Sequence, residues 1–395
     1  MPPSSHAPSY DPDAPVSVAA AIHINVISAA MLLIQPAFVQ ALVDRVGLSD
    51  AAAGNVAGAE MLGVAIGAML VALLASRVNW RVSSMLALGV IVAATVGSIW
   101  AAPSSLGGVR LIAGIGSGWI MSLSFEAVGR SGAPDRNFAW LVTAALLFGA
   151  VVVFSMPWLL DVAGLRGFLL LLAAYYATGF LGVSRLPAAV QPRPTASNDL
   201  STGSVPATQF RLAMPLRWLA IAAMFFYYIA QGAVWAYLAL MGSARGLADA
   251  AVATSLTLSQ LAGLVAVLAA GALAGRVARS LALPIGIIAA GIALWLLLGP
   301  QTAAMYGLLV CAFNASWNWT DPYLLGTMAS ADSSGRVMVW AIAWRLLGLA
   351  IGPFAAAQLI DGADYSKVIA LGIAALGMAL CCLFAPLRAL QGRRG

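Results

Sequence analysis

The sequence predicts an all-α membrane protein with twelve transmembrane helices in two pseudo-symmetric six-helix bundles. Of its 395 residues, 62% are apolar and 9% are charged, whereas soluble domains are about 45–50% apolar. The mean hydropathy is +0.93, so one soluble core cannot cover the apolar side chains and a bilayer must act as their solvent. Two further observations, a series of apolar stretches and an internal repeat, divide the chain into two halves.

Each apolar stretch is close to the roughly 20 residues that a helix needs to cross a bilayer. We place twelve spans at 16–41, 51–74, 82–101, 107–128, 138–159, 166–184, 214–240, 250–273, 281–299, 303–328, 338–359 and 367–387. A segment rich in proline, serine and threonine after the sixth span is typical of a flexible linker. The predicted organisation is a disordered cytosolic tail at 1–15, a bundle at 16–185, a cytosolic linker at 186–213, a second bundle at 214–387 and a tail at 388–395.

The two halves repeat each other's sequence. The motif GLSDAA at 47–52 recurs as GLADAA at 246–251, and Arg77-Val78 recurs as Arg276-Val277, both 199 positions later. Four further matches, displaced by 200 positions, are Trp119 with Trp319, Arg136 with Arg336, Trp140 with Trp340 and Asp161 with Asp361. Six matches in the same order indicate a duplication. Duplicated six-span units in parallel orientation are a transporter design, in which the ligand lies between halves that move around it.

The positions of the basic residues predict the orientation. With the amino terminus in the cytosol, fourteen arginines in the loops, tails or span ends are cytosolic, and Arg45, Arg166, Arg245 and Lys367 lie on the other side. This asymmetry obeys the positive-inside rule, so we expect both termini in the cytosol and the protein in a plasma membrane, in a bacterium the inner membrane. The arginines are scattered between apolar runs, which excludes a basic surface for nucleic acid.

Several chemistries are excluded by the polar inventory. Three cysteines lie in apolar runs and only two histidines are present, so a metal site is not expected. No Gly-x-x-x-x-Gly-Lys loop for ATP occurs, and no nucleophile, base or metal set is clustered as an enzyme requires. We therefore expect no enzyme activity and no cofactor. The expected partners of a monomeric chain are the lipid bilayer, a small-molecule substrate and protons.

Three segments resemble motifs of the major facilitator superfamily, and the resemblance covers about residues 16–387. In GALAGRVAR, Gly271, Leu273, Arg276 and Arg279 match the family's loop signature, and a second copy, ALLASRVNWR, keeps Arg77 and Arg81. In RLIAGIGSG, Arg110, Gly114, Gly116 and Gly118 match the family's pattern for the fourth span. The antiporter motif of the fifth span is absent, because FGAVVVFSMPWLL contains only Pro157, and this disfavours a drug:proton exchanger.

The resemblance implies a secondary transporter that works by alternating access, with spans 1, 4, 7 and 10 around a central cavity. It also implies that Glu126 contacts the loop arginines of a cytosolic gate, Arg77, Arg81, Arg276 and Arg279. The alternative for Glu126 is an ion pair within its own helix, with Arg130 four residues later. For Arg110, the resemblance implies a part in proton coupling, and the alternative is a side chain that snorkels to the membrane surface.

Polar residues form stripes on three of these spans. Asn314, Trp317, Asn318 and Asp321 are spaced so that they share one face of a helix. Span 7 carries Tyr228, Gln231 and Trp235, and span 1 carries Asn25, Ser28 and Gln35. Because lipid cannot satisfy such groups, we interpret the stripes as the lining of a water-filled substrate site. The alternative is that the amides link helices and the tryptophans pack or face lipid.

Charged residues inside the membrane each cost about 2.5–3.5 kcal/mol on insertion scales and so require a function or a partner. Asp321 and Arg345 lie at similar depth on the antiparallel spans 10 and 11. They predict either a structural ion pair or a substrate site in which Arg345 holds an anionic group, and Asp321 is also a candidate for proton coupling. Glu60 has no basic residue at an obvious matching depth, which predicts a proton-coupling carboxyl or a permanently protonated one.

Taken together, the residues predict a proton-coupled secondary transporter for a small organic solute, with an anionic or aromatic substrate favoured by Arg345 and the tyrosine and tryptophan side chains. Two alternatives stay open. One is an exporter that exchanges a drug or metabolite for protons. The other is a membrane protein of the same build that senses a solute without transporting it, or passes it as a channel.

Overall fold

The computed structural model describes residues 11–188, 212–331 and 336–391, and within these ranges the chain is almost entirely helical. The first bundle contains α1 (Pro15–Ala41), a π-helical turn (Leu42–Val46), α2 (Asp50–Leu74), α3 (Trp80–Gly97), α4 (Pro103–Gly129), α5 (Pro134–Ala177) and α6 (Gly179–Val183). The second contains α7 (Met214–Trp235), α8 (Leu238–Ser243), α9 (Asp249–Ala272), α10 (Arg279–Leu296), α11 (Ala303–Ala331), α12 (Arg336–Ala357) and α13 (Ser366–Gln391). Most of the predicted tails and linker, at 1–10, 189–211 and 392–395, lie outside the described residues.

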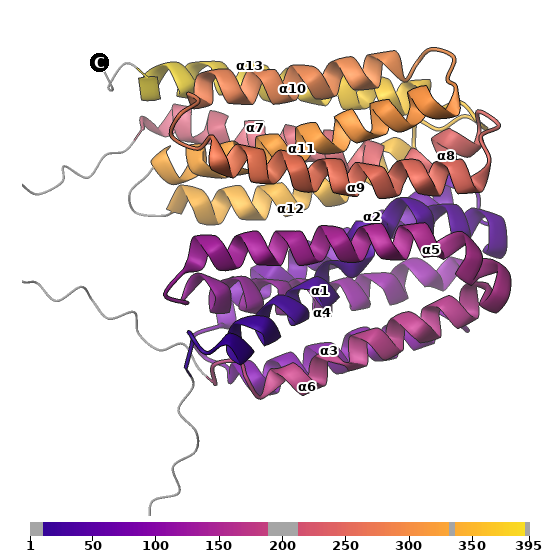
Figure 1. Cartoon of the computed structure of the whole chain (residues 1–395), viewed down its shortest axis with the longest axis horizontal. Helices are drawn as coiled ribbons and strands as arrows, with labels where there is room; N and C mark the ends of the chain where they lie inside the picture. Colours follow the sequence, from indigo (N-terminus) through magenta and orange to yellow (C-terminus); the bar gives the residue numbers. More distant parts are fainter. Residues whose placement is uncertain (1–10, 189–211, 332–335, 392–395) are drawn as a thin grey trace, which may run out of the picture.

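The two bundles lie side by side with their helices along the long axis of the molecule (Figure 1). The start of α1 and the end of α13 are at the same end, which we call the terminal end, and the opposite end is called the far end (Figure 1). This arrangement is the predicted fold, with six spans in each bundle. It also explains the exposed apolar side chains, such as Leu181 at 83% and Trp100 at 72%, which suit contact with lipid.

The predicted span boundaries needed two corrections. Spans 5 and 6 are joined in α5, which contains a sharp turn at Gly164 with φ 64° and ψ 179°. This backbone conformation is essentially restricted to glycine, so the connection is made by one residue and not by a loop. Span 7, expected to be continuous, ends at Trp235, and the short helix α8 follows after Ala236 and Tyr237.

In the described part of the chain, ten helical stretches are long and apolar enough to cross a membrane. One of them, Arg136–Val183, contains both spans 5 and 6. The helix α11 is missing from this set although its 29 residues could span a bilayer. Its sequence contains the predicted polar stripe, so the same residues that lower its hydropathy are candidates for function.

The far end shows the internal repeat in its ion pairs. Asp161 accepts from Arg45 at 2.6 Å, and its repeat mate Asp361 lies 3.9 Å from Lys367. All four side chains are more than 40% exposed, so these pairs contribute little to stability.

Candidate functional site

Glu60 of α2 and Arg110 of α4 form an ion pair that is sealed inside the first bundle. The Arg110 Nε donates to Glu60 Oε2 at 3.0 Å, and its Nη2 donates to Oε1. The side chains of Arg110 and Glu60 are 1% and 3% exposed. Thr95 accepts from the third guanidinium nitrogen at 3.4 Å, and the ring of Phe38 lies 5.7 Å from the guanidinium. Neither charge is accessible to a solute here.

This pair corrects two predictions. Glu60 does have a basic partner at its own depth, and Arg110 is buried and does not snorkel to the membrane surface. The helices α2 and α4 run in the same direction from the far end, and the two residues follow their helix starts by similar numbers of residues. The helices also touch closely, because a Cβ on Gly114 would lie 2.1 Å from the Glu60 carbonyl oxygen. The long arginine side chain therefore reaches the carboxylate directly.

A second ion pair joins α11 and α12 in the other bundle. Arg345 Nη2 donates to Asp321 Oδ2 at 3.1 Å, and the Tyr228 hydroxyl of α7 donates to Asp321 Oδ1. The Arg345 guanidinium also lies over the Tyr228 ring, 4.6 Å from its centroid. In contrast to the first pair, the Arg345 and Asp321 side chains are 28% and 22% exposed. The structure thus contains an ion pair at the predicted position, and both of its charges are accessible.

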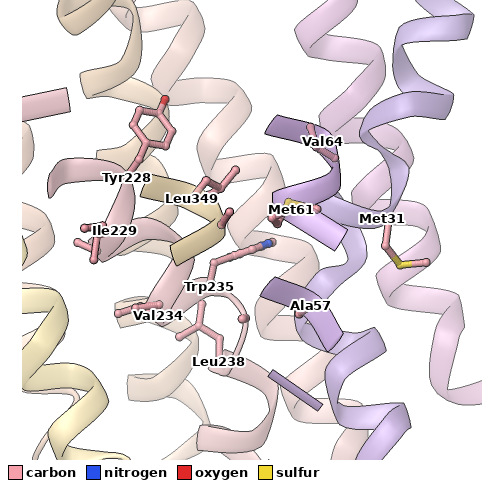
Figure 2. Packing of buried hydrophobic residues seen from close by; sticks show 14 of the residues in the cluster. Met31, Ala57, Met61, Val64, Tyr228, Ile229, Val234, Trp235, Leu238 and Leu349 are labelled. Carbon is pink, nitrogen blue, oxygen red and sulfur yellow. The ribbon is translucent and has the colours of Figure 1, made fainter. Parts of the chain in front are cut away.

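Aromatic side chains connect this pair to the boundary between the bundles. Trp317 packs edge-on against Tyr228 and Trp235, with ring centroids 6.2 and 6.1 Å apart. The Trp235 indole donates to the backbone oxygen of Leu32 in α1, at 2.8 Å, and so contacts the first bundle. Figure 2 shows this indole pointing from α7 toward α2, where Met61 lies. The accessible pair therefore belongs to a group of five side chains at the bundle interface, Tyr228, Trp235, Trp317, Asp321 and Arg345, which we call the interface cluster.

The predicted stripe on α11 divides between two environments. Asn314, 3% exposed, donates to the Ser259 backbone oxygen of α9 at 2.8 Å. Asn318 donates to Asn314 at 2.9 Å and packs against Gly263 of α9. The expectation that the whole stripe faces a common wet space is therefore wrong for Asn314, because the amides turn toward α9. The alternative interpretation, that such amides link helices, describes these two residues.

The remaining amides of the predicted substrate site are buried. Asn25 is 2% exposed and donates to Ser124 of α4 at 2.8 Å. Gln35 and Gln231 are 1% and 0% exposed, and their amide groups have no hydrogen-bond partner among the described residues. Among the described residues, no hydrogen bond joins these three side chains to the interface cluster.

The predicted gate residues mostly bind within their own bundle. Glu126 pairs with Arg130 at 2.9 Å, which is the intrahelical alternative. Arg81 donates to the Leu186 backbone oxygen at 2.7 Å, so it fastens the end of the first bundle to the first turn of α3. The other loop arginines differ: Arg279 donates to Ser330, Arg276 donates to the Ala272 backbone oxygen, and Arg77 is exposed.

Hydrogen bonds between the two bundles lie from the middle of the helices to the far end. Among the described residues they are Trp235 to Leu32, Gln260 to Leu33, Thr257 to Ala150, and Tyr365 to Asp50. Sequence reasoning did not identify the last of these, because nothing in a loop tyrosine indicates a partner 315 positions away. At the same end, Tyr237 packs so closely on Gly54 that a Cβ there would lie 1.5 Å from its hydroxyl oxygen.

Comparisons with known proteins agree with this architecture. A D-xylose-proton symporter superposes with a TM-score of 0.70 at 16% identity, over 92% of this chain and 96% of that one. The nucleoside transporter NupG, in a mutant form, superposes with a TM-score of 0.70 at 11% identity, over 94% of this chain and 99% of that one. The inward open xylose transporter XylE from E. coli superposes with a TM-score of 0.68 at 17% identity, over 91% of this chain and 94% of that one.

At these identities the structural neighbours establish the fold alone, and no curated protein matches the chain in sequence. The sequence model of the Major Facilitator Superfamily matches residues 18–353, which is most of the chain. The fold and the match to the family's sequence model together indicate a transporter and not an enzyme. The chain belongs to the Major Facilitator Superfamily.

Proposed function

We propose that the protein is a secondary active transporter that moves a small organic solute across the membrane by alternating access, driven by protons. The interface cluster is the observation that carries this proposal. Charges inside a membrane are costly, so they face the bundle interior or a water-filled cavity and commonly mark a substrate or ion pathway. The Asp321–Arg345 pair is partly exposed and lies among aromatic rings at the bundle interface. We assign solute contact to the partly exposed Asp321, Arg345 and Trp317, and a positioning role to Tyr228 and Trp235, which are 0% and 2% exposed.

The distribution of contacts between the bundles supports alternating access. Hydrogen bonds between the described parts of the two bundles occur from mid-depth to the far end, where Tyr365 meets Asp50. Such a distribution favours a state in which the solute reaches the cluster from the terminal end. Rocking of the bundles would break the far-end contacts and form new ones at the terminal end.

We assign proton coupling to Asp321. Its carboxylate is accessible and lies in contact with the proposed solute site, whereas Glu60 is bonded twice by Arg110 out of reach of solvent. We further propose that both termini are cytosolic, that the protein works as a monomer, and that the membrane is a plasma membrane, in a bacterium the inner one. A symporter among the structural neighbours, described as a D-xylose-proton symporter, is compatible with coupling to protons.

A flux measurement separates the candidate functions. Purified protein in proteoliposomes is supplied with pooled organic solutes, and uptake is followed by mass spectrometry with and without an imposed pH gradient. Symport predicts accumulation toward the alkaline side. Export by proton exchange predicts accumulation toward the acidic side, and a sensor predicts binding without flux. Equal flux with and without the gradient would contradict proton coupling.

Matched variants test the assignment of residues. Arg345→Ala and Asp321→Asn should reduce gradient-driven flux to the level of empty liposomes, because they remove the proposed solute and proton contacts. Arg45→Ala and Asp361→Asn remove the same kinds of charge from exposed ion pairs and should keep wild-type flux. Loss of flux in the control variants, or full flux in both site variants, would show that the cluster is not the transport site.

A further inference from the structure

We propose that the transported solute is a monoanion with an apolar or aromatic body, and that one proton on Asp321 accompanies each molecule. This inference rests on the proposed function and deepens it by naming the substrate class and the stoichiometry. Its structural basis is the incomplete hydrogen bonding of Arg345 together with the charge balance of the interface cluster.

Arg345 has unused hydrogen-bonding capacity. A guanidinium has five N–H donors in a planar fork, and Arg345 donates to one carboxylate oxygen, of Asp321. Its remaining donors bind none of the described residues, and its side chain is 28% exposed. By contrast, Arg110 uses all three nitrogens on Glu60 and Thr95. The free donors of Arg345 suit an oxyanion such as a carboxylate or sulfonate, which can accept two of them at once.

The cluster is electrically neutral without a solute. The charged or titratable groups that face Asp321 are Arg345 from α12 and the hydroxyls of Tyr227 and Tyr228 from α7. The other helices that pack on α11 carry their charged side chains at or near their ends: Asp249 on α9, Arg279 on α10, and Lys367 and Arg388 on α13. A monoanion on Arg345 would leave one uncompensated negative charge there. Protonation of Asp321 removes that charge, so solute and proton bind together.

Tyr228 allows this exchange without loss of the site's geometry. Its hydroxyl donates to Asp321 Oδ1, and it can accept a hydrogen bond instead when Asp321 carries a proton. Its ring also holds the Arg345 guanidinium at 4.6 Å, so the arginine stays in place after it releases the carboxylate. Tyr228 is therefore a positioning residue for both charges.

The body of the solute is indicated by the walls of the cluster. Trp317 lies between Tyr228 and Trp235, with ring centroids 6.2 and 6.1 Å away. The Trp235 indole N–H is already bonded to Leu32. Tyr228 and Trp235 are 0% and 2% exposed, so the ring surface available beside the charged pair is that of the partly exposed Trp317. An indole face next to a guanidinium favours an aromatic or apolar body over a sugar with many hydroxyls.

Binding and proton uptake are measured on the purified protein with named probes. Benzenesulfonate, phenylacetate and hippurate are the monoanions, their neutral amides are the uncharged analogues, phthalate is the dianion, and xylose is the sugar. Binding is measured by calorimetry in two buffers of different ionisation enthalpy, which gives the protons taken up per solute. Benzenesulfonate cannot carry its own proton at neutral pH, so any proton taken up must reside on the protein.

The expected result is that at least one monoanion binds to the wild type with uptake of about one proton, while the amides, phthalate and xylose do not bind. Arg345→Gln should weaken anion binding about 10- to 100-fold. Asp321→Asn should keep anion binding and abolish proton uptake. Arg45→Gln is the control, and the double variant Asp321→Asn with Arg345→Gln, which carries no charge at the site, tests folding.

Three outcomes would overturn the inference: neutral amides that bind as well as the anions, anion binding without proton uptake, or proton uptake that persists in Asp321→Asn. Other results separate a failure of this inference from a failure of the proposed function. If proteoliposomes transport xylose or an amide and no monoanion, the protein is a transporter and only the substrate class is wrong. If neither binding nor flux is found for the pooled solutes and these probes, both proposals are wrong.

Discussion

The two ion pairs of the membrane interior have the same chemistry and opposite surroundings. Glu60–Arg110 in the first bundle is 3% and 1% exposed and is bonded through both carboxylate oxygens. Asp321–Arg345 in the second bundle is 22% and 28% exposed and is bonded through one. The comparison shows that a charged residue inside the membrane indicates a functional site only when its side chain is also accessible. A sealed pair holds helices together, whereas an open pair has donors left for a ligand.

Helix packing produces the difference. The helices α2 and α4 approach at Gly63, Gly67, Gly114 and Gly118, where a Cβ would lie 2.0–2.1 Å from backbone oxygens of the neighbouring helix. This contact closes over Glu60 and Arg110. In the second bundle the close approach, at Gly232, Gly348 and Gly352, is between α7 and α12. Among the described glycines, none gives the helix that carries Asp321 such a contact with α12, and the pair with Arg345 stays open.

The largest expected effect comes from breaking the sealed pair. Glu60→Gln leaves the buried Arg110 cation without a counter-charge and should lower the free energy of unfolding by about 3–5 kcal/mol. The measurement is thermal unfolding of the detergent-solubilised protein. The double variant Glu60→Met with Arg110→Met, which removes both charges, should recover most of that loss. A Glu60→Gln variant as stable as the wild type would show that the pair is not structural.

A smaller effect is expected from opening the helix contact that seals the pair. A Cβ in Gly114→Ala would meet the Glu60 carbonyl at 2.1 Å, so α2 and α4 must separate, at a cost of about 1–3 kcal/mol. Gly89→Ala in α3 is the matched control, because nothing lies within 4 Å of its new Cβ. Unfolding measurements should distinguish the two variants, and equal stability would mean that the close contact is not needed.

Weakening the far-end contact between the bundles should change the surroundings of the Asp321–Arg345 pair and leave those of the Glu60–Arg110 pair unchanged. Tyr365→Phe removes the hydrogen bond to Asp50 and should weaken far-end closure by about 1 kcal/mol, which is a roughly fivefold change in population. Hydrogen–deuterium exchange is then expected to rise in α11 and α12 around Asp321 and Arg345. Exchange in α2 and α4 around Glu60 should stay as in the wild type. A rise in both bundles would indicate general loosening.

The smallest expected effect on stability is at the open pair. Asp321→Asn should lower the free energy of unfolding by no more than about 1 kcal/mol, because the pair is partly exposed and Arg345 keeps access to solvent. Gradient-driven flux should nevertheless be lost. Measured side by side, Glu60→Gln should harm stability more than Asp321→Asn. The reverse order would mean that exposure does not separate the structural pair from the functional one.

Much of the fold was predictable because a bilayer leaves few solutions. Apolar stretches of spanning length, the repeat at 199 and 200 positions and the polar linker predicted two bundles of six spans. Because spans 10 and 11 are antiparallel, the similar depths of Asp321 and Arg345 also predicted that these two residues lie close together. The same depth argument missed Glu60 and Arg110, because the closeness of α2 and α4 depends on glycines whose contacts are visible only after packing.

The sequence by itself determined the class of protein, the number and order of its spans and the chemical types in its interior, because hydropathy and spacing act along the chain. Tertiary structure alone decided which polar groups are sealed and which are open. Asn314 turned to α9 and Arg110 to Glu60, while Asp321 and Arg345 kept accessible surface beside Tyr228. The physical reason is that accessibility belongs to the contacts between helices, and those depend on which side chains let two backbones approach.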